Sequence, residues 1–452
     1  MVAERVEGGR RTTPAAKQIA VLGLPMLIGA LSSSLTGVVD TAMMGRYGAA
    51  DLSAVAAASA VFDVLSSVVL ASVTGHQILA ARFAGREDPP GLRRSLVDSA
   101  RFCGAVALAL TAVCLLAGGV LTRLVSGGDE GLGAIGADYL VARGPTLLLL
   151  VPFALLAATF NAYKRPGFAL VAGITANVVN LGLDLLLIHV LRWGAVGNGV
   201  ATTVSWLVAL GVLVVSTRRF RLAELLSRPG PGTPVDFTTS VVGLGWPAIV
   251  SNALDYLSTA LFFAVVGGLG GAALGGGRIA FEVMVLLFAV GSAFAAAGRI
   301  LIGRAIGANA PAEAASLWRA GQRVLLVPAV ALGLVLVLAP GAVAAVFTSF
   351  PDVVDAAAAA LPLVGVSVPL LAWTLGNVNA LRALGRTKQD MHANLVSALA
   401  VQLPLGWLLT TAVDWGVTGA YVGVLGYWLA RAVVTEVMAR RLMRTLGEGA
   451  GT

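Results

Sequence analysis

The sequence predicts an all-α polytopic membrane protein whose twelve transmembrane helices form two six-helix lobes related by pseudo-twofold symmetry. Of its 452 residues, 58% are hydrophobic and only 12% are charged, which is about half the charge of a typical soluble domain. Twelve apolar runs are each long enough to cross a hydrocarbon core of roughly 30 Å. The two halves of the chain also repeat each other at an offset of 222 residues, which separates Pro25 from Pro247.

Charged or Gly/Pro-rich breaks separate the twelve runs, a pattern typical of successive membrane spans. The first run is too long for the core of a signal peptide, so we expect it to stay in the protein as a membrane anchor. We expect the spans at residues 17–45, 52–82, 95–120, 138–160, 167–191, 195–217, 238–268, 278–304, 318–340, 358–382, 388–412 and 417–440.

Basic residues indicate which side of the membrane each connection occupies. They gather in the even-numbered connections and in the two tails, whereas the odd-numbered connections hold few beyond Arg46, Arg123 and Arg192. By the positive-inside rule, both termini are cytoplasmic. Short basic clusters between apolar runs are typical of membrane proteins, so the net charge of +8 gives no reason to expect a nucleic-acid partner. The rarity of lysine fits a bacterial source, and we expect the protein in the bacterial plasma (inner) membrane, with the lipid bilayer as its surroundings.

A connection rich in proline and glycine lies at the midpoint of the chain. It predicts a first lobe over residues 1–217, a cytoplasmic linker over 218–237 and a second lobe over 238–452. Because each lobe has an even number of spans, both have the same orientation, and we expect an axis along the membrane normal with the substrate path between the lobes. The repeat pairs Arg82 with Arg304, and we expect both to reach the membrane surface at the cytoplasmic ends of their spans.

The first span contains two residues that are unusual inside a membrane. Asp40 places a carboxyl group near its end, and intramembrane acids usually face a bundle interior or a water-filled cavity. Pro25 removes a backbone hydrogen bond and predicts a kink. Gly29, Ser33 and Gly37 form a stripe of small residues along which a neighbouring helix can approach and slide. These features predict a moving helix with a switch that responds to protonation.

The fifth span carries a polar face. Asn177, Asn180 and Asp184 are spaced i, i+3 and i+7, which places them within about 60° of one another around a helix. Hydrogen bonding between packed helices is one explanation for the asparagines. An acid in the same lobe as Asp40 favours a cation site instead. A buried carboxylate is costly to ionise and two neighbouring carboxylates repel, so such a pair can take up and release a proton.

Three motifs resemble one transporter family, the multidrug and toxic compound extrusion (MATE) family. The motifs are LPMLIGALSSSLTGVVDTAMMGRYGAADLSAVA in the first lobe, GHQILAARFAG at the end of the second span, and its second-lobe counterpart AAGRILIGRAIGAN. The resemblance covers essentially the whole chain. An acid late in span one, together with the polar face of span five, looks like the prokaryotic DinF-like branch. This resemblance implies a V-shaped pair of six-helix bundles that exports drugs or metabolites in exchange for protons or sodium.

The resemblance also implies which residues bind the coupling ion. Two acids are the proton carriers, two asparagines are their hydrogen-bond partners, and two further residues line the same pocket in DinF-like relatives. An oxygen-rich set of this kind can also hold Na⁺, at Asp40, Asn180 and Asp184, so the sequence leaves the choice between H⁺ and Na⁺ open. No other cofactor is expected. The proton carriers are Asp40 and Asp184, their hydrogen-bond partners are Asn177 and Asn180, and the two further pocket residues are Tyr139 and Thr202.

Further acids lie outside this set. Asp255 follows Pro247 by eight residues, which matches the spacing of a span-seven acid in another branch of the family, and Glu282 lies early in span eight. That branch also has an acid in span ten, where this chain has none, so we expect an incomplete cation site in the second lobe. Asp63 in span two fits no family pattern; it either faces the central cleft or lies near a helix end.

The main expectation is an exporter of amphipathic, often cationic compounds, and other classes of function predict other sequence features. A major-facilitator transporter would carry G-x-x-x-D-R-x-G-R-R after its second span, whereas this chain reads RFAGREDPPGLRR. A flippase for lipids or lipid-linked precursors, which usually has a cationic cavity, is an alternative, as is a sodium-coupled metabolite exporter. Three scattered histidines and the absence of hydrolase or phosphate-loop motifs argue against an enzyme. We expect a monomer whose partners are small-molecule drugs or metabolites.

Overall fold

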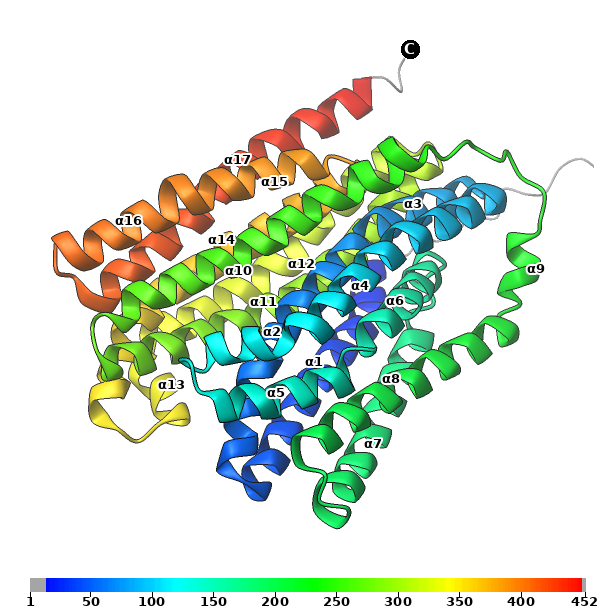
Figure 1. The fold of residues 1–452 in the computed structure, drawn as a ribbon. Coiled ribbons are helices and arrows are strands. Elements are labelled where there is room, and N and C mark those ends of the chain that lie inside the picture. Colours follow the sequence, from blue (N-terminus) through cyan, green and yellow to red (C-terminus); the bar gives the residue numbers. More distant parts are fainter. Residues whose placement is uncertain (1–13, 449–452) are drawn as a thin grey trace, which may run out of the picture.

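The computed structural model describes residues 14–448, and over this range all regular secondary structure is helical. Figure 1 shows long helices lying side by side, with the helices of the first half of the chain on one side of the bundle and those of the second half on the other. The basic N-terminal residues Arg10 and Arg11 lie outside the described residues.

The first half of the chain forms α1 (Ala15–Tyr47), α2 (Ala49–Ser72), α3 (Thr74–Arg86), α4 (Pro89–Val125), α5 (Glu130–Arg143), α6 (Thr146–Ala162), α7 (Gly167–Asp184) with a π-helical extension (Leu185–Val190), α8 (Gly194–Arg219) and α9 (Leu222–Leu226). The second half forms a π-helical turn (Phe237–Val242), α10 (Gly243–Gly267), α11 (Gly271–Gly307), α12 (Pro311–Leu338), α13 (Pro340–Phe347), α14 (Pro351–Ala383), α15 (Thr387–Leu395), α16 (Leu403–Trp407) and α17 (Gly416–Glu448), with π-helical turns at Val396–Gln402 and Leu408–Ala412.

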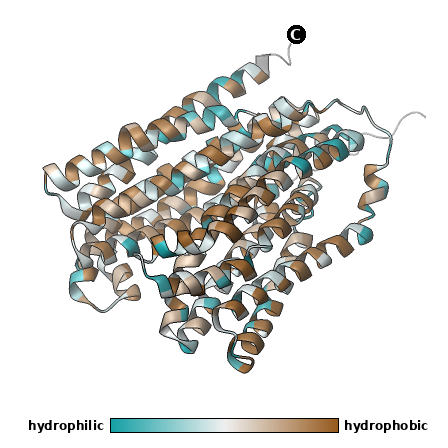
Figure 2. Cartoon of the chain, viewed as in Figure 1, coloured by the Kyte–Doolittle hydropathy of each residue, from teal (hydrophilic) through white to brown (hydrophobic). Residues whose placement is uncertain are grey.

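The prediction of twelve spans is confirmed, because the described residues contain twelve helical stretches that are long and apolar enough to cross a membrane. Much of the ribbon in these stretches has the colour of hydrophobic residues in Figure 2. Three spans contain two α-helices each: α2 with α3, α5 with α6, and α15 with α16 across a π-helical turn. The second of these breaks falls at Gly144 and Pro145, where the proline has no N–H to continue the helix.

Several helices extend beyond the predicted boundaries. The third span was expected at 95–120, but α4 begins at Pro89, since proline suits the first turn of a helix and Asp88 caps it. The short helices α9 and α13 were not predicted, because neither is long enough to give an apolar run of membrane length.

The internal repeat is visible in the backbone. Arg192 and Asp414, which are 222 residues apart, have φ angles of 58° and 59°, and the glycines two residues further on, Gly194 and Gly416, have 54° and 57°. Two left-handed residues in the same order make the same turn before α8 and before α17. The two halves therefore share this turn as well as their helix order.

Helix α1 packs against both halves of the molecule. Near its start, Ile19 and Leu22 are buried in a cluster with Ile300 and Leu301 of α11. Near its end, Met44 is buried in the core of the first lobe. A displacement of α1 would therefore disturb packing in both lobes.

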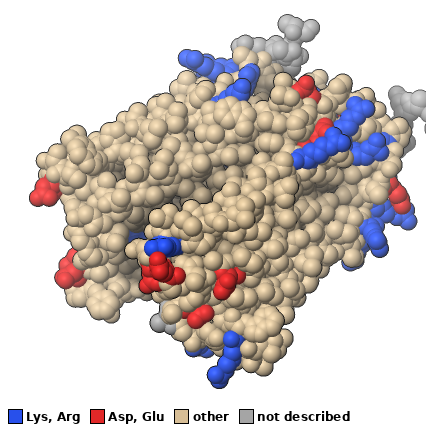
Figure 3. Space-filling view, in the orientation of Figure 1, with Lys and Arg blue, Asp and Glu red and all other residues tan. Residues whose placement is uncertain are grey.

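The lobes also make close contact at the end of the molecule where α3 and α11 finish. Arg82 of α3 donates from Nε (3.0 Å) and Nη2 (2.7 Å) to the Ala383 carbonyl of α14. In the equivalent position, Arg304 of α11 donates from Nη1 to the Ala162 carbonyl of α6 (2.6 Å). Our expectation that both arginines reach the membrane surface is wrong: each one caps the last carbonyls of a helix in the opposite lobe. Figure 3 shows many of the visible basic side chains toward this end, which we call the basic end.

The linker between the lobes is held by one buried acid, Asp88, which lies between α3 and α4. Its Oδ1 accepts hydrogen bonds from the backbone N–H groups of Gly91 and Gly232 (3.0 Å each), and its Oδ2 accepts one from Thr233 (2.9 Å). Burial acts to raise the pKa of Asp88, but these hydrogen bonds outweigh it and hold the pKa below its usual value. The carboxylate thus contributes stability at neutral pH that is lost only as the pH falls below the usual range for aspartate.

Replacing Asp88 with alanine is expected to release the linker and to cost about 1 kcal/mol through loss of the α4 cap alone. Tryptic cleavage after the exposed Arg221 should become faster, measured by gel electrophoresis against time. Asp129→Ala is the matched control, since Asp129 caps α5 through Leu132 (2.9 Å) without contacting the linker. Equal cleavage rates in both variants would contradict this role for Asp88.

Candidate functional site

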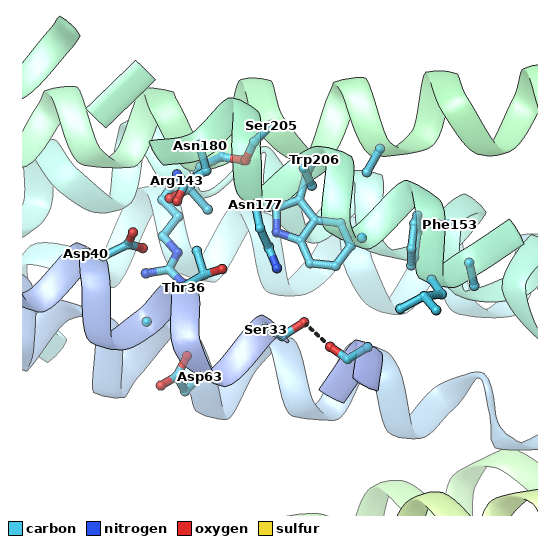
Figure 4. Close-up of a pocket in the computed structure, with 18 of the residues that line it drawn as sticks. Ser33, Thr36, Asp40, Asp63, Arg143, Phe153, Asn177, Asn180, Ser205 and Trp206 are labelled. Carbon is cyan, nitrogen blue, oxygen red and sulfur yellow. Dashed lines mark hydrogen bonds between the residues drawn. The ribbon is translucent and has the colours of Figure 1, made fainter. Parts of the chain in front are cut away.

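The first lobe contains a cavity of about 620 Å³, a size typical of small-molecule sites. Its wall comes mainly from α1, α2, α5, α7 and α8, and part of it is shown in Figure 4. Phe153 and Trp206 form an aromatic section, with ring centroids 5.0 Å apart in a T-shaped arrangement. The rest combines small residues with a group of polar and charged side chains. This lining suits a molecule that has both apolar and polar parts.

Two acids on neighbouring helices face each other beside this cavity. Asp40 of α1 lines the cavity, and Asp184, the last residue of α7, is fully buried behind it. Their carboxyl groups lie close enough to interact with each other. An ionised carboxyl group can only accept hydrogen bonds, so a hydrogen bond between these two acids requires a proton on one of them. Asn198 of α8 supports the pair by donating from its amide to Oδ1 of Asp184 (3.2 Å).

Three oxygen atoms around the acid pair have spare capacity to accept a proton or coordinate a cation. They are Oδ1 of Asp40, Oδ2 of Asp184 and Oδ1 of Asn180, and all three are buried without a hydrogen-bond partner among the described residues. Buried polar atoms are normally paired. Unpaired oxygens beside a cavity are therefore good candidates for binding an ion.

The other predicted pocket residues lie around the same cavity. Asn177 of α7 donates to the Ser32 hydroxyl of α1 (2.5 Å), which links the two helices that carry the acids. Tyr139 is buried, lines the cavity and shares a hydrogen bond with Ser59 (2.9 Å). Thr202 also lines the cavity. Its hydroxyl donates to the backbone carbonyl four residues earlier in α8 (3.0 Å). The structure thus brings together residues from spans one, four, five and six.

Two residues of the site were not anticipated from the sequence. Asn198 precedes Thr202 by four residues, so both lie on one face of α8, and this spacing could have revealed it. Arg143 lies in the interior of the fourth span, where an ionisable residue is itself a signal of function. Both line the cavity. Asp63, for which the sequence left two positions open, also lines the cavity from α2.

The second-lobe acids do not line this cavity. Asp255 lies on an exposed part of α10 and accepts a hydrogen bond from the Asn394 amide (2.9 Å). Glu282 forms an ion pair with Arg278 one turn earlier in α11 (2.8 Å).

The second lobe does contain a buried cluster of charges, in which each charged group has a partner. Asp390 is buried and forms ion pairs with Arg382 (2.7 Å) and Arg431 (3.1 Å). Arg431 also donates to the Tyr427 hydroxyl, which donates to the Asn394 side-chain carbonyl (2.8 Å). Because the acid already has two guanidinium partners, this cluster resembles a structural network more than a site for an external cation.

Pro25 lies inside α1, which is one continuous helix over Ala15–Tyr47. It lines the cavity. Two residues earlier, a Cβ atom on Gly23 would lie 2.5 Å from the Phe294 ring of α11, so α1 approaches the second lobe closely at this level. The proline therefore lies where α1 passes from contacts with the second lobe to the cavity of the first.

Twelve membrane-length helices among the described residues, together with a cavity of this size in the first lobe, define a polytopic membrane transport protein. The MatE family model matches residues 25–186 and 247–408, and the chain therefore belongs to the MatE family of transporters. The two matched segments are again offset by 222 residues, the offset of the internal repeat. The family predicted from the sequence is confirmed.

Similar proteins cover almost the whole chain. A probable multidrug resistance protein NorM of Thermotoga maritima is 24% identical over 453 residues, covering 94% of this chain and 96% of its own length. The corresponding protein of Caulobacter vibrioides is 28% identical over 425 residues, covering 89% and 86%. A crystal structure of MATE in the bent conformation superposes with a TM-score of 0.89 at 19% identity, covering 97% of this chain and 98% of that one. This likeness shows that the fold is shared.

Proposed function

We propose that the protein is a secondary active multidrug exporter that exchanges amphipathic, often cationic compounds for protons or Na⁺ by alternating access. The observation that carries this proposal is the pair formed by Asp40 and Asp184 beside the first-lobe cavity. A carboxyl pair beside a cavity can bind a cation from either of two sources, the coupling ion or the cargo. Competition between them is the simplest way to couple their movements.

The protonation state of Asp40 and Asp184 determines the charge of the site that binds the cargo. With one shared proton the pair carries a single negative charge, and loss of that proton leaves two carboxylates in direct repulsion. A cationic cargo relieves this repulsion, so its binding is favoured when the proton has left. Rebinding of a proton weakens the attraction and releases the cargo.

The same change of charge can alter the conformation of the lobes. Asp40 lies near the end of α1 in the first lobe, while Ile19 near its start is buried against the second lobe. A movement of α1 near Asp40 would therefore also change how Ile19 packs against the second lobe. The proton then has different binding energies in the two conformations, which is the requirement for driving a conformational change.

The choice of coupling ion follows from the same atoms. The unpaired oxygens of Asp40, Asn180 and Asp184 offer three ligands to Na⁺, while the carboxyl pair needs only one proton to become hydrogen-bonded. The interaction between the two carboxyl groups favours the proton, because the repulsion of two neighbouring carboxylates is relieved when one of them is protonated. Two relatives described as probable multidrug resistance proteins support drugs as the cargo. The basic end supports a cytoplasmic location of both termini, in the inner membrane of a bacterium.

Transport by purified protein in proteoliposomes tests this proposal, with a pH gradient and a Na⁺ gradient imposed separately. One pH unit supplies about 1.4 kcal/mol per proton, enough for about a tenfold concentration ratio of cargo at one-for-one exchange. We expect the pH gradient to drive uptake of a fluorescent cationic dye above the level of protein-free liposomes. If neither gradient drives uptake, the proposal is wrong.

A further inference from the structure

Arg143 is the only basic side chain that the described residues place in the wall of the first-lobe cavity. We propose that Arg143 forms an anion-recognising subsite, so that the cavity preferentially binds zwitterionic amphipathic molecules. In this arrangement a carboxylate of the cargo pairs with Arg143, and the cationic part faces Asp40 and Asp184. The inference rests on the proposed function, since it names the class of cargo for the same cavity.

Neutral partners hold the Arg143 side chain in place. It is the last residue of α5, and its Nη1 donates to the Ser59 hydroxyl (3.2 Å) and to the Tyr139 hydroxyl. The guanidinium carbon lies 4.3 Å from the centroid of the Phe62 ring, a distance at which a cation is attracted to the ring face. These contacts fix the orientation of the guanidinium without neutralising its charge.

No acid within the described part of the chain forms a contact ion pair with Arg143. Its guanidinium has no carboxylate oxygen within 4.0 Å. Its Nε is buried and has no hydrogen-bond partner among these residues. Arg431 in the second lobe shows the usual alternative, because it pairs directly with Asp390. A partly desolvated cation without a contact partner is costly, and a carboxylate from the cargo would satisfy it through the paired N–H groups of the guanidinium.

The cavity therefore presents separate positive and negative groups. In Figure 4, Arg143 extends toward α1, with Asp40 on one side of its guanidinium and Asp63 on the other in that view. Both acids influence Arg143 electrostatically, although neither is in contact with it. A purely cationic molecule would be attracted by the acids and repelled by Arg143. A zwitterion can match both charges at once.

Equilibrium binding to the purified protein tests the inference without any ion gradient. The probes are a rhodamine with a free carboxyl group and its methyl ester, which share one fluorophore and differ in this single charge. Fluorescence polarisation in detergent gives the dissociation constant of each dye. We expect the wild-type protein to bind the free acid about tenfold more tightly than the ester, because a charge-assisted pair with Arg143 forms only with the acid. Equal affinities, or no measurable binding of either dye, would overturn the inference.

Substitutions assign the preference to this side chain. Arg143→Gln should weaken binding of the free acid about tenfold and leave the ester unchanged or bound more tightly, since the repulsion of a cation is removed. Arg143→Lys keeps the charge and should keep the wild-type order of affinities. Arg123→Gln is the matched control, because Arg123 pairs with Glu130 on the exposed surface (2.9 Å) and lies outside the cavity wall. An equal loss for both dyes in Arg143→Gln would mean that Arg143 only supports the cavity structure.

Failure of this inference can be told apart from failure of the proposed function. The dye comparison measures binding alone, whereas the proposed function is tested by transport under imposed gradients. If the protein exports a cationic dye but binds the acid and the ester equally well, the proposed function holds and the anion subsite is wrong. If the protein binds the acid more tightly than the ester but neither gradient drives transport, the anion subsite holds and the proposed coupling is wrong.

Discussion

Asp184→Asn is expected to abolish ion-coupled export while leaving a folded protein at normal membrane abundance. Asparagine has nearly the same shape and still accepts the hydrogen bond from Asn198, but it cannot release a proton. Asp40→Asn should have the same effect, because a proton shared by two acids is lost when either acid is removed. The double substitution should be no worse than either single one, since residues that act as a unit are not additive.

Drug resistance of a sensitised bacterial host gives the first readout, and the proteoliposome assay gives the second. We expect resistance to fall to the level of a host without the transporter. Asp138→Asn is the matched control: this acid lies in the same lobe on the exposed side of α5 and is not part of the cavity wall. Unchanged resistance in Asp184→Asn would show that the buried pair does not carry the coupling ion.

Gly307→Ala is expected to prevent close contact of the lobes at the basic end. A Cβ atom on Gly307 would lie 2.0 Å from the backbone carbonyl oxygen of Arg82, and one on Gly85 would lie 2.0 Å from that of Arg304. Backbone atoms cannot rotate away, so the two helices must part by about 1 Å or more. Overpacking of this kind costs about 1–3 kcal/mol, which reduces the population of the closed arrangement about 5-fold to 150-fold.

Spin labels on exposed residues of the two lobes can report this opening. Arg93 of α4 and Glu313 of α12 are exposed, and the two native cysteines are buried, so labels can be placed on introduced cysteines. We expect longer distances and slower transport in Gly307→Ala. Gly211→Ala in α8 is the matched control, because no atom of the described residues lies within 4 Å of its Cβ position and alanine favours a helix. Identical distance distributions in all three proteins would contradict the role of this glycine contact.

Most of the fold could be predicted because membrane spans are local features. A run of apolar residues is enough to identify each span, and the offset between Pro25 and Pro247 indicates the two halves. The break at Gly144 was missed because the apolar residues on both sides were taken as one span, although Gly144 and Pro145 are signals of a helix break. The contacts of Arg82 and Arg304 were also missed. Their partners are backbone carbonyls about 301 and 142 residues away in sequence, and backbone groups leave no sequence signature.

Part of the candidate site could also be predicted, because some of its residues form a local pattern in the sequence. Asn177, Asn180 and Asp184 lie on one helix face, so their spacing indicates that they act together. Asp40 was recognised because a carboxyl group inside an apolar run is costly. Contact between Asp40 and Asp184 depends on how α1 packs against α7, which no local pattern contains. The position of Arg143 beside the same cavity depends in turn on the packing of α5 against α2 and α8.

Proton release on cargo binding is the most direct test of the central claim that a proton shared by Asp40 and Asp184 is exchanged for cargo. Purified protein in weakly buffered detergent solution is mixed with a saturating cationic dye, and a pH indicator measures the protons released. The wild-type protein should release about one proton for each dye bound, while Asp40→Asn and Asp184→Asn should bind dye and release none. Dye binding by the wild-type protein without proton release, or equal release from the two variants, would contradict the account.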